Sequence, residues 1–433
     1  MVNNKKVILL KVLFAVFVFV PLVLFFKENA GLSFSLYTMG RLAAVYAVSF
    51  LCLQFILSSR LGLIEKGVGH PRLLKWHKKI GKLATIFVIL HPLGLTFFSL
   101  KLGLDFGGII RSYTAYHYLG SVALLLIFVV VASSIYSSKI NLNYENWKVA
   151  HKLVYIILVL TFIHSFFLGS DVAARNSLYY WWVLVYGLSV AGVVHRHVYL
   201  PYLFRKSIFE VVNNKMLTQN TRSITLKSLD RKLVFKPGQF VFVTFYSRLL
   251  KQEDHPFTIS SSAADTLVEL TIKASGDFTA QLSKLRRGDR ARLTGPYGVF
   301  TPREERSLFF IVGGVGITPV MSILRSFAET RNNRKIKLVY ANKTRKDILF
   351  FDELSKISKR LGAEIKHVLS QEKLKGFSEG RIDAPMLQAE LKGWSDSVFY
   401  VVGPRAMVQD ITSMLGKLGV PGRNIVTELF SLK

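Results

Sequence analysis

The sequence predicts three consecutive domains: a six-helix transmembrane bundle, an antiparallel β-barrel and a doubly wound α/β domain. Three observations predict this order. Long apolar runs recur in the first half of the chain and end near Leu200. Short runs of alternating apolar and polar residues then extend from about Phe209 to Arg303, and strand and helix patterns alternate from Leu308 onward. We therefore place the domains at 1–206, 207–304 and 305–433.

Composition and charge restrict the possible partners. With 433 residues the chain is too long for one hydrophobic core. The net charge is +30, and many of the Lys and Arg residues lie just outside apolar runs, which fits a membrane surface or a phosphorylated cofactor. No nucleic-acid motif accompanies the charge, so we do not expect nucleic acid as a partner. Cys52 is the only cysteine, which excludes intramolecular disulfides and all-cysteine iron–sulfur clusters.

Six apolar segments each approach the ~20 residues that a bilayer requires. The first follows two lysines and could be a signal peptide, but it is long and no A-x-A motif precedes Gly31, so we expect a retained span. The basic loops between spans predict that both termini and the second half of the chain are cytoplasmic. The predicted spans are Val7–Phe26, Leu36–Leu57, His77–Leu100, Ala115–Tyr136, Val149–Gly169 and Leu178–His195.

Two of these spans each carry a pair of histidines. His77 and His91 lie 14 residues apart in the third span, and His151 and His164 lie 13 apart in the fifth. Both spans run outward, so His77 and His151 share the inner level and His91 and His164 the outer, roughly 20 Å away. Two imidazoles at one depth can ligate a haem iron from both sides. Two such levels predict two stacked haems, against the alternative of four unrelated polar residues.

The spacing in the fifth span does not fit a regular helix. Fourteen residues return to within about 40° of the same face, but 13 end about 140° away. Either this helix is distorted or two haems approach it from different sides. Arg41, near the outer end of the second span, either extends to the interface or pairs with a haem propionate. His117 has no partner at its depth and is not assigned as a ligand.

Three motifs carry a family resemblance. RLLKWHKKIG at Arg72–Gly81, NWKVAHKLVY at Asn146–Tyr155 and GRLAA at Gly40–Ala44 resemble the ferric-reductase-like transmembrane family, which includes the NADPH oxidases. The resemblance implies six helices with two bis-histidine b-type haems. It extends over nearly the whole chain, because the second half resembles the flavin and nicotinamide domains of the same family.

Two polar stretches at strand ends predict a flavin site. Alone, such stretches are more typical of turns. Together they resemble the HPFT-x-S and K-x-x-G-x-(F/W)-T elements of ferredoxin-reductase-like proteins, and this resemblance implies FAD. His255, Pro256, Phe257 and Thr258 would line the flavin. The residues that would contact its ring or pyrophosphate are Lys273, Gly276, Phe278 and Thr279.

A buried strand, a glycine-rich turn and a helix begin the last domain. Gly313, Gly314 and Gly316 permit close approach of a phosphate to the helix start, and Thr318 could add a hydroxyl. The family uses Gly295 and Gly298 at the same site. Two cations after the second strand could neutralise the 2′-phosphate of NADPH, although a solvated basic loop is an equal alternative. These cations are Lys343 and Arg345.

The last predicted site residues lie beside the flavin by resemblance. Val402-Gly403-Pro404 stands where the family commonly has Cys-Gly-Pro at the hydride-transfer position, so any thiol role is in doubt. Glu428-Leu429-Phe430 resembles the terminal acidic-x-aromatic sequence, whose aromatic covers the flavin ring. We therefore expect Thr258, Gly403 and Phe430 to be the catalytic positions.

The predicted activity is that of a transmembrane NADPH oxidase. Electrons would pass from NADPH through FAD and two haems to oxygen, producing superoxide on the far side. A ferric or cupric metalloreductase uses the same motifs and remains an alternative, as does an electron donor to an extracytoplasmic protein or quinone. No EF-hand, Pro-rich or SH3-like segment is present, so we expect no obligatory regulatory subunit. The predicted partners are the lipid bilayer and a small electron acceptor.

Overall fold

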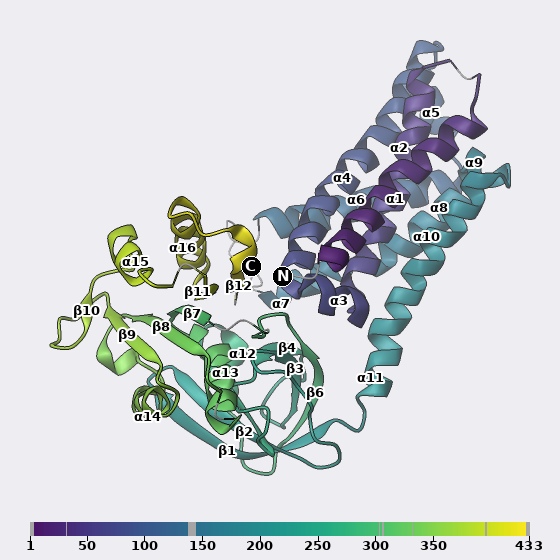
Figure 1. Cartoon of the computed structure of the whole chain (residues 1–433). Helices are drawn as coiled ribbons and strands as arrows, with labels where there is room; N and C mark the ends of the chain where they lie inside the picture. Colours follow the sequence, from purple (N-terminus) through teal and green to yellow (C-terminus); the bar gives the residue numbers. More distant parts are fainter. Residues whose placement is uncertain are drawn as a thin grey trace. The chain divides into compact units, whose positions relative to one another are not determined.

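The chain forms two compact units. A computed structural model describes residues 4–31, 33–136, 144–302, 304, 307–330, 332–394 and 396–429. Lys5–Ile64 and Arg72–Tyr199 form one unit, here called the helical unit, and Leu200–Lys433 with Glu65–Pro71 form the other, the sheet unit. Figure 1 shows that the long helices belong to the first and the strands to the second. The three-domain boundaries stay a prediction.

Five helices among the described residues are long and apolar enough to cross a membrane, and they coincide with the second to sixth predicted spans. They are Leu36–Ser58, Arg72–Lys101, Ala115–Tyr136, Asn146–Leu168 and Ser177–Leu203. A further helix, α1, covers the predicted first span, and the count of six spans stays a prediction. The long helices are α1 (Asn4–Glu28), α2 (Leu36–Ser58), α4 (His70–Lys101), α6 (Ala115–Tyr136), α8 (Val154–Leu168) and α10 (Ser177–Val194). The short ones are α3 (Gly62–Val68), α5 (Phe106–Arg111), α7 (Tyr144–His151), α9 (Ser170–Ala173), η1 (His195–Tyr199) and α11 (Leu200–Leu203).

Local sequence explains where these helices begin. The Ser35 hydroxyl accepts a hydrogen bond from the Thr38 amide and caps α2. The Asn176 side chain accepts one from the Leu178 amide and caps α10. Such caps satisfy amides that have no partner inside the helix. The apolar residues between the caps cannot all be covered by neighbouring helices, and Leu125 of α6 remains 63% exposed, as expected of a lipid-facing side chain.

The fifth predicted span is interrupted directly after His151. Helix α7 ends there, Lys152 and Leu153 form a turn, and α8 begins at Val154. The amides of Lys152, Leu153 and Tyr155 donate to carbonyls three residues earlier, at 3.1–3.2 Å. A three-residue turn rotates about 120° per residue instead of 100°, so three such steps add about 60°. The helix is therefore locally distorted, which reduces the offset of about 140° to about 80°. The side from which each haem would approach stays a prediction.

The sheet unit begins with a six-stranded antiparallel sheet of order β4-β3-β6-β1-β2-β5. An antiparallel bridge between Ile259 and Leu270 joins the two edges. Alternate residues such as Val211, Ile224 and Val243 are fully buried on its inner face. The strands are β1 (Ile208–Thr218), β2 (Thr221–Ser228), β3 (Phe240–Tyr246), β4 (His255–Thr258), β5 (Leu267–Lys273) and β6 (Arg290–Tyr297), with α12 (Asp277–Gln281) and η2 (Leu282–Lys284) after β5.

A parallel sheet of order β10-β9-β8-β7-β11-β12 follows. The chain leaves β7 toward β8 and β9 on one side, then returns to add β11 and β12 on the other. The order therefore reverses between β7 and β11, where nucleotides bind in such sheets. The strands are β7 (Ser307–Gly313), β8 (Lys335–Asn342), β9 (Glu364–Leu369), β10 (Ser378–Glu379), β11 (Val398–Gly403) and β12 (Ile425–Leu429). The helices are η3 (Gly314–Gly316), α13 (Ile317–Thr330), η4 (Arg345–Asp347), α14 (Phe351–Leu361), α15 (Ala384–Glu390), α16 (Arg405–Lys417) and η5 (Gly422–Asn424).

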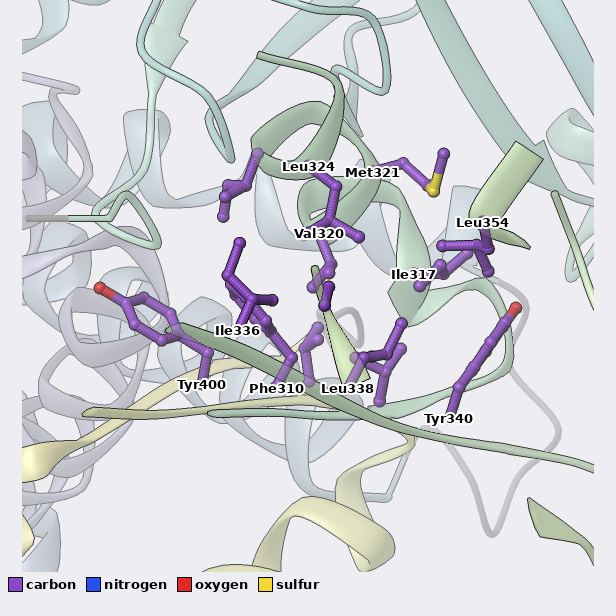
Figure 2. Packing of buried hydrophobic residues seen from close by; sticks show 14 of the residues in the cluster. Phe310, Ile317, Val320, Met321, Leu324, Ile336, Leu338, Tyr340, Leu354 and Tyr400 are labelled. Atoms are coloured by element: carbon purple, nitrogen blue, oxygen red, sulfur yellow. The ribbon is translucent and has the colours of Figure 1, made fainter. Parts of the chain in front are cut away.

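Helices cover both faces of this parallel sheet. Figure 2 shows Val320 and Leu324 of α13 directed at Phe310 and Leu338 of the strands. On the other face the strand residues pack against α15 and α16, as Val401 does. Burying each such side chain contributes about 1.5–3 kcal/mol. The predicted doubly wound arrangement is thus present, and its core holds the carboxyl ends of β7 and β11 together.

Candidate functional site

The four predicted histidines meet in two pairs within the helical unit. The ring centroids of His77 and His151 are 6.1 Å apart, and those of His91 and His164 are 6.3 Å apart. A metal ion bound between two imidazole nitrogens, with bonds of roughly 2 Å, places the ring centroids about 6 Å apart. Each pair joins α4 to the α7–α8 segment. Among the described residues no group of three or more His, Cys, Asp or Glu could hold a metal ion.

Backbone carbonyls orient His91 and His164, the predicted outer pair. His91 Nδ1 lies 3.0 Å from the Gly40 carbonyl oxygen, and His164 Nδ1 lies 2.9 Å from that of Tyr116. When Nδ1–H donates to a carbonyl, the other ring nitrogen, Nε2, carries the lone pair that can ligate a metal. At the inner pair, the side-chain amide of Gln54 lies 2.7 Å from His77 Nδ1.

Glycines allow helices to approach this outer pair. A Cβ at Gly120 would lie 2.5 Å from His164 Nδ1, so the imidazole occupies the space that a side chain on α6 would fill. A Cβ at Gly94 would lie 2.9 Å from the Gly40 Cα. Sequence reasoning did not single out Gly94 or Gly120. A glycine inside an apolar span is the signal that could have indicated close contact between helices. Glycine lowers helix stability, so its presence there suggests that a neighbouring group needs the space of the missing side chain.

Arg41 pairs with a carboxylate that the sequence did not indicate. Its guanidinium forms an ion pair with Asp171, in which Nε donates to Oδ2 at 3.3 Å and Nη2 donates to Oδ1. The side chains are only 15% and 14% exposed. The role of Arg41 toward a haem propionate stays a prediction. His117 has a local role instead, since its Nδ1 accepts from the Thr114 amide at 3.1 Å.

The predicted flavin residues of β4 and α12 come together in the sheet unit. The His255 ring stacks on Phe278 with centroids 3.7 Å apart, and it lies 6.3 Å from Phe257 on its own strand. His255 Nε2 is 3.4 Å from a Glu253 carboxylate oxygen. In β4, Pro256 pairs with Phe242 and the buried Thr258 pairs with Phe240. These residues are therefore adjacent, as a shared ligand would require.

The second flavin motif forms a turn with accessible backbone. The Thr279 hydroxyl oxygen accepts hydrogen bonds from the Ser275 and Gly276 amides at 2.9 and 3.1 Å. Its hydroxyl therefore orders the turn. Lys273 is exposed at the end of β5, and a Cβ at Gly276 would meet nothing within 4 Å. A cation and an open glycine backbone at one strand end can accommodate an anion such as a pyrophosphate.

At two other predicted positions the backbone conformation explains why glycine is present. Gly295 and Gly298 have φ of +142° and +103°, values that residues with a side chain rarely adopt. A Cβ at Gly298 would also lie 3.1 Å from the Phe240 ring. They flank Tyr297, which is 5% exposed and ends β6. Gly295 therefore shapes the end of β6, and Gly298 shapes the turn after it.

The glycine-rich turn after β7 divides into packing and open positions. A Cβ at Gly313 would lie 2.5 Å from Met407 Sδ, and one at Gly316 would lie 2.9 Å from the Val402 carbonyl oxygen. Gly314 has φ of +54° and meets nothing within 4 Å. Of the three, Gly314 is the position where a phosphate can approach the backbone. Tyr340, fully buried, donates from its hydroxyl to the Gly314 carbonyl at 3.0 Å and holds this turn.

Gly403 is the last residue of β11, Pro404 lies between β11 and α16, and Thr318 lies in the first turn of α13. Their roles toward a cofactor stay predictions. Gly403 has φ of +157° and a Cβ there would lie 3.1 Å from the Gly313 amide nitrogen, so the ends of β7 and β11 touch. Pro404 precedes the first residue of α16. Thr318 is 1% exposed, and its hydroxyl donates to the Val315 carbonyl at 3.2 Å. Thr318 therefore uses its hydroxyl within the turn.

The two predicted 2′-phosphate cations differ in their surroundings. Lys343 is exposed, whereas the Arg345 guanidinium lies over the Phe351 ring, 3.4 Å from its centroid. The Arg345 amide donates to a Glu372 carboxylate oxygen at 2.6 Å. Burial, and then the nearby Arg345, lower the pKa of His367 to about 4, so this ring is neutral. Sequence reasoning missed this aromatic and acidic group, which the start of α14, strand β9 and the loop after β9 supply.

Near the chain end, Glu428 is buried opposite Val402 of β11. Burial raises its pKa to about 8, and its Oε2 has no hydrogen-bond partner among the described residues. A protonated carboxylic acid is therefore held beside the switch point at neutral pH. Phe430, predicted to cover the flavin, lies outside the described residues.

Comparison with known families agrees with this order of parts. The ferric reductase like transmembrane component family matches residues 43–162. The FAD-binding domain family matches residues 206–300, and the oxidoreductase NAD-binding domain family matches residues 310–413. Together the matches place a transmembrane component before the two cofactor domains.

Individual relatives cover about half of the chain. The sulfhydrogenase 2 subunit gamma of Pyrococcus furiosus is 29% identical over 52% of this chain and 83% of its own length. The ferredoxin reductase component of a Rhodococcus rhodochrous 3-ketosteroid-9-alpha-monooxygenase is 28% identical over 54% of this chain and 68% of its own. A flavohemoglobin structure from Malassezia yamatoensis covers 94% of this chain and 98% of its own with a TM-score of 0.51 and 16% identity, a likeness of fold alone. The chain therefore joins a part similar to the ferric reductase like transmembrane component to FAD-binding and NAD-binding oxidoreductase domains, and it is an NAD(P)H oxidoreductase.

Proposed function

We propose that this protein is a transmembrane NADPH oxidase. It takes electrons from cytoplasmic NADPH and delivers them through FAD and two b-type haems to oxygen on the far side of the membrane, where superoxide forms. The observation that carries the proposal is the pair of histidine pairs, with ring centroids 6.1 and 6.3 Å apart on the same two helical segments. One histidine pair could be accidental packing, but two at a metal-compatible spacing support two haems.

The surroundings of the histidines fit a flat cofactor. Within the span windows of α4 and α7–α8 only 6% of residues are buried by protein, compared with 56% in α2. The histidine-bearing helices are therefore the least covered of the five candidate spans among the described residues, as suits helices that contact both lipid and haem. His77 with His151 would hold the inner haem and His91 with His164 the outer one. Carbonyls of Gly40 and Tyr116 would keep Nε2 of the outer pair directed at iron.

The sheet unit supplies sites for the flavin and the nicotinamide nucleotide. His255, Phe257 and Phe278 would border the FAD ring, and the turn at Gly276 with Lys273 would face its pyrophosphate. The switch point, with open Gly314, would receive the NADPH pyrophosphate. Lys343 and Arg345 lie after β8 and would bind the 2′-phosphate. When bound, flavin exchanges a hydride for single electrons and haem passes single electrons on.

With two histidines on each iron, no ligand position is left for oxygen. A haem held by His91 and His164 would have to pass its electron to an acceptor that does not bind the iron, so the acceptor must be small and able to accept one electron at a time. Oxygen meets these requirements.

In this proposal the chain has six spans with both termini cytoplasmic, a closed flavin barrel over 207–304 and a nucleotide domain over 305–433.

Acceptor competition tests the proposal. Haem-loaded protein receives NADPH together with oxygen and a ferric chelate, and reduction of cytochrome c is followed with and without superoxide dismutase. We expect most electron flow to be sensitive to the dismutase. NADPH oxidation without any superoxide in air would refute the oxidase. Dominant, dismutase-insensitive reduction of the ferric chelate would identify a metalloreductase instead.

A further inference from the structure

The Arg41–Asp171 pair joins residues 130 positions apart at the outer end of the helical unit. Asp171 lies in α9, in the connection between α8 and α10, and Arg41 lies in the second turn of α2. Two donors of the guanidinium face both oxygens of one carboxylate. Because both side chains are about 15% exposed, water screens this pair less than a surface pair.

The pair is adjacent to the outer histidines. Arg41 directly follows Gly40 in the chain, and the Gly40 carbonyl oxygen accepts a hydrogen bond from His91. Arg41 is therefore one residue away from the group that orients His91. Asp171 comes seven residues after His164, just past the end of α8. The outer histidine pair, from which electrons would leave the protein, therefore has one cation and one anion beside it, and these two are in contact with each other. Sequence alone indicated only the cation, which would by itself make this edge attractive to anions.

We propose that Asp171 determines which acceptors the outer edge accepts. By neutralising Arg41 it keeps the local potential low, so that a small uncharged acceptor such as oxygen is not displaced by anionic metal chelates. This inference rests on the proposed function, because it concerns the acceptor end of the same electron route. Asp171 is a positioning and charge-compensating residue and does not itself transfer electrons.

The test compares two impermeant acceptors of equal and opposite charge. Ferricyanide carries three negative charges and hexaammineruthenium(III) three positive ones. NADPH is trapped inside sealed vesicles that contain the haem-loaded protein, and each acceptor is added outside, so that the flavin cannot reduce it directly. The measured quantity is the ratio of kcat/KM for ferricyanide to that for hexaammineruthenium(III). Haem content, measured from absorbance, checks each variant.

Asp171→Asn exposes the charge of Arg41 and should raise this ratio by at least about tenfold at low ionic strength, since one charge acts on three charges about 10 Å away in water. Added salt should reduce the difference by screening. Arg41→Gln leaves Asp171 unopposed and should lower the ratio by a similar factor. Removing both charges together should return the ratio close to the wild-type value.

Asp105→Asn is the matched control. Asp105 is an exposed carboxylate in the connection after α4, which is on the same side as Asp171, and it caps α5 rather than pairing with Arg41. Its replacement should change the ratio less than twofold. An unchanged ratio in both Asp171→Asn and Arg41→Gln, or an equal change in Asp105→Asn, would overturn the inference. If wild-type protein reduces neither acceptor across the membrane, the proposed function itself has failed.

Discussion

Replacing Gly120 by alanine should remove the outer haem while leaving the inner one. The structure gives the magnitude. The added Cβ would lie 2.5 Å from His164 Nδ1, 2.6 Å from Cε1 and 3.1 Å from Cγ. Ordinary contact begins near 3.4 Å, so the ring must move by about 1 Å, whereas metal–ligand bonds tolerate only about 0.2 Å. The shift also separates His164 from the Tyr116 carbonyl that orients it.

The assay counts haems and follows electrons separately. Haem per protein, determined from the absorbance of the extracted haem complex, should fall from about two to about one. Superoxide formation should fall at least tenfold, since the acceptor end of the route is lost. Reduction of a soluble dye by NADPH at the flavin should stay at the wild-type rate, because the sheet unit is untouched.

Gly187→Ala provides the matched control for that experiment. Gly187 lies inside α10, and a Cβ there would meet nothing within 4 Å. This variant should keep both haems and the wild-type superoxide rate, and replacing a helical glycine by alanine should stabilise α10 slightly. If Gly120→Ala also kept two haems and full superoxide production, the role given to His164 would be refuted.

Three predictions concern the sheet unit. Tyr340→Phe removes the hydrogen bond to Gly314 and should raise KM for NADPH about two- to tenfold with little change in kcat. Steady-state kinetics would measure both constants. A fall in kcat with an unchanged KM would contradict this role of Tyr340. Gly316→Ala forces a Cβ to 2.9 Å from the Val402 carbonyl oxygen. Because this obstacle is backbone, the cost should lie at the upper end of about 1–3 kcal/mol or above. Gly314→Ala meets no atom within 4 Å and should cost only the ~1–2 kcal/mol of its left-handed backbone, so Gly316→Ala should have the lower melting temperature, and equal melting temperatures would argue against this division. Glu428 has a folded pKa of about 8, above its ordinary value, so its stabilising contribution is complete below pH ~4.5 and is lost as pH rises through 8. Glu428→Gln should therefore gain thermal stability relative to wild type between pH 5 and pH 9, and a pH-independent difference would contradict the assignment.

Periodic and spaced features could be predicted from the sequence. The pairing of His77 with His151 required only span lengths and loop charges, and the structure brings those rings together. The alternation of strands and helices likewise predicted the parallel sheet, because apolar periodicity is local. The position of the helix break at Lys152 could not be predicted, since it depends on which carbonyls the amides find after folding.

Contacts between distant residues that no repeated spacing indicates were beyond sequence reasoning. Asp171 has no neighbour in the chain that indicates Arg41, and only the packed helices bring them together. Gly120 likewise became informative only when the His164 ring was seen against it. In the glycine-rich turn, the motif did not separate Gly314, which is open, from Gly313, which packs on Met407. Side-chain volume and long-range packing decide such roles.

The most direct test of the electron route is its direction across a membrane. Haem-loaded protein is sealed into vesicles with NADPH trapped inside, and superoxide is detected outside with impermeant cytochrome c. The route proposed here predicts dismutase-sensitive reduction outside, which is abolished when His91 or His164 is replaced. Superoxide that forms only on the NADPH side, or persists outside without these histidines, would contradict it.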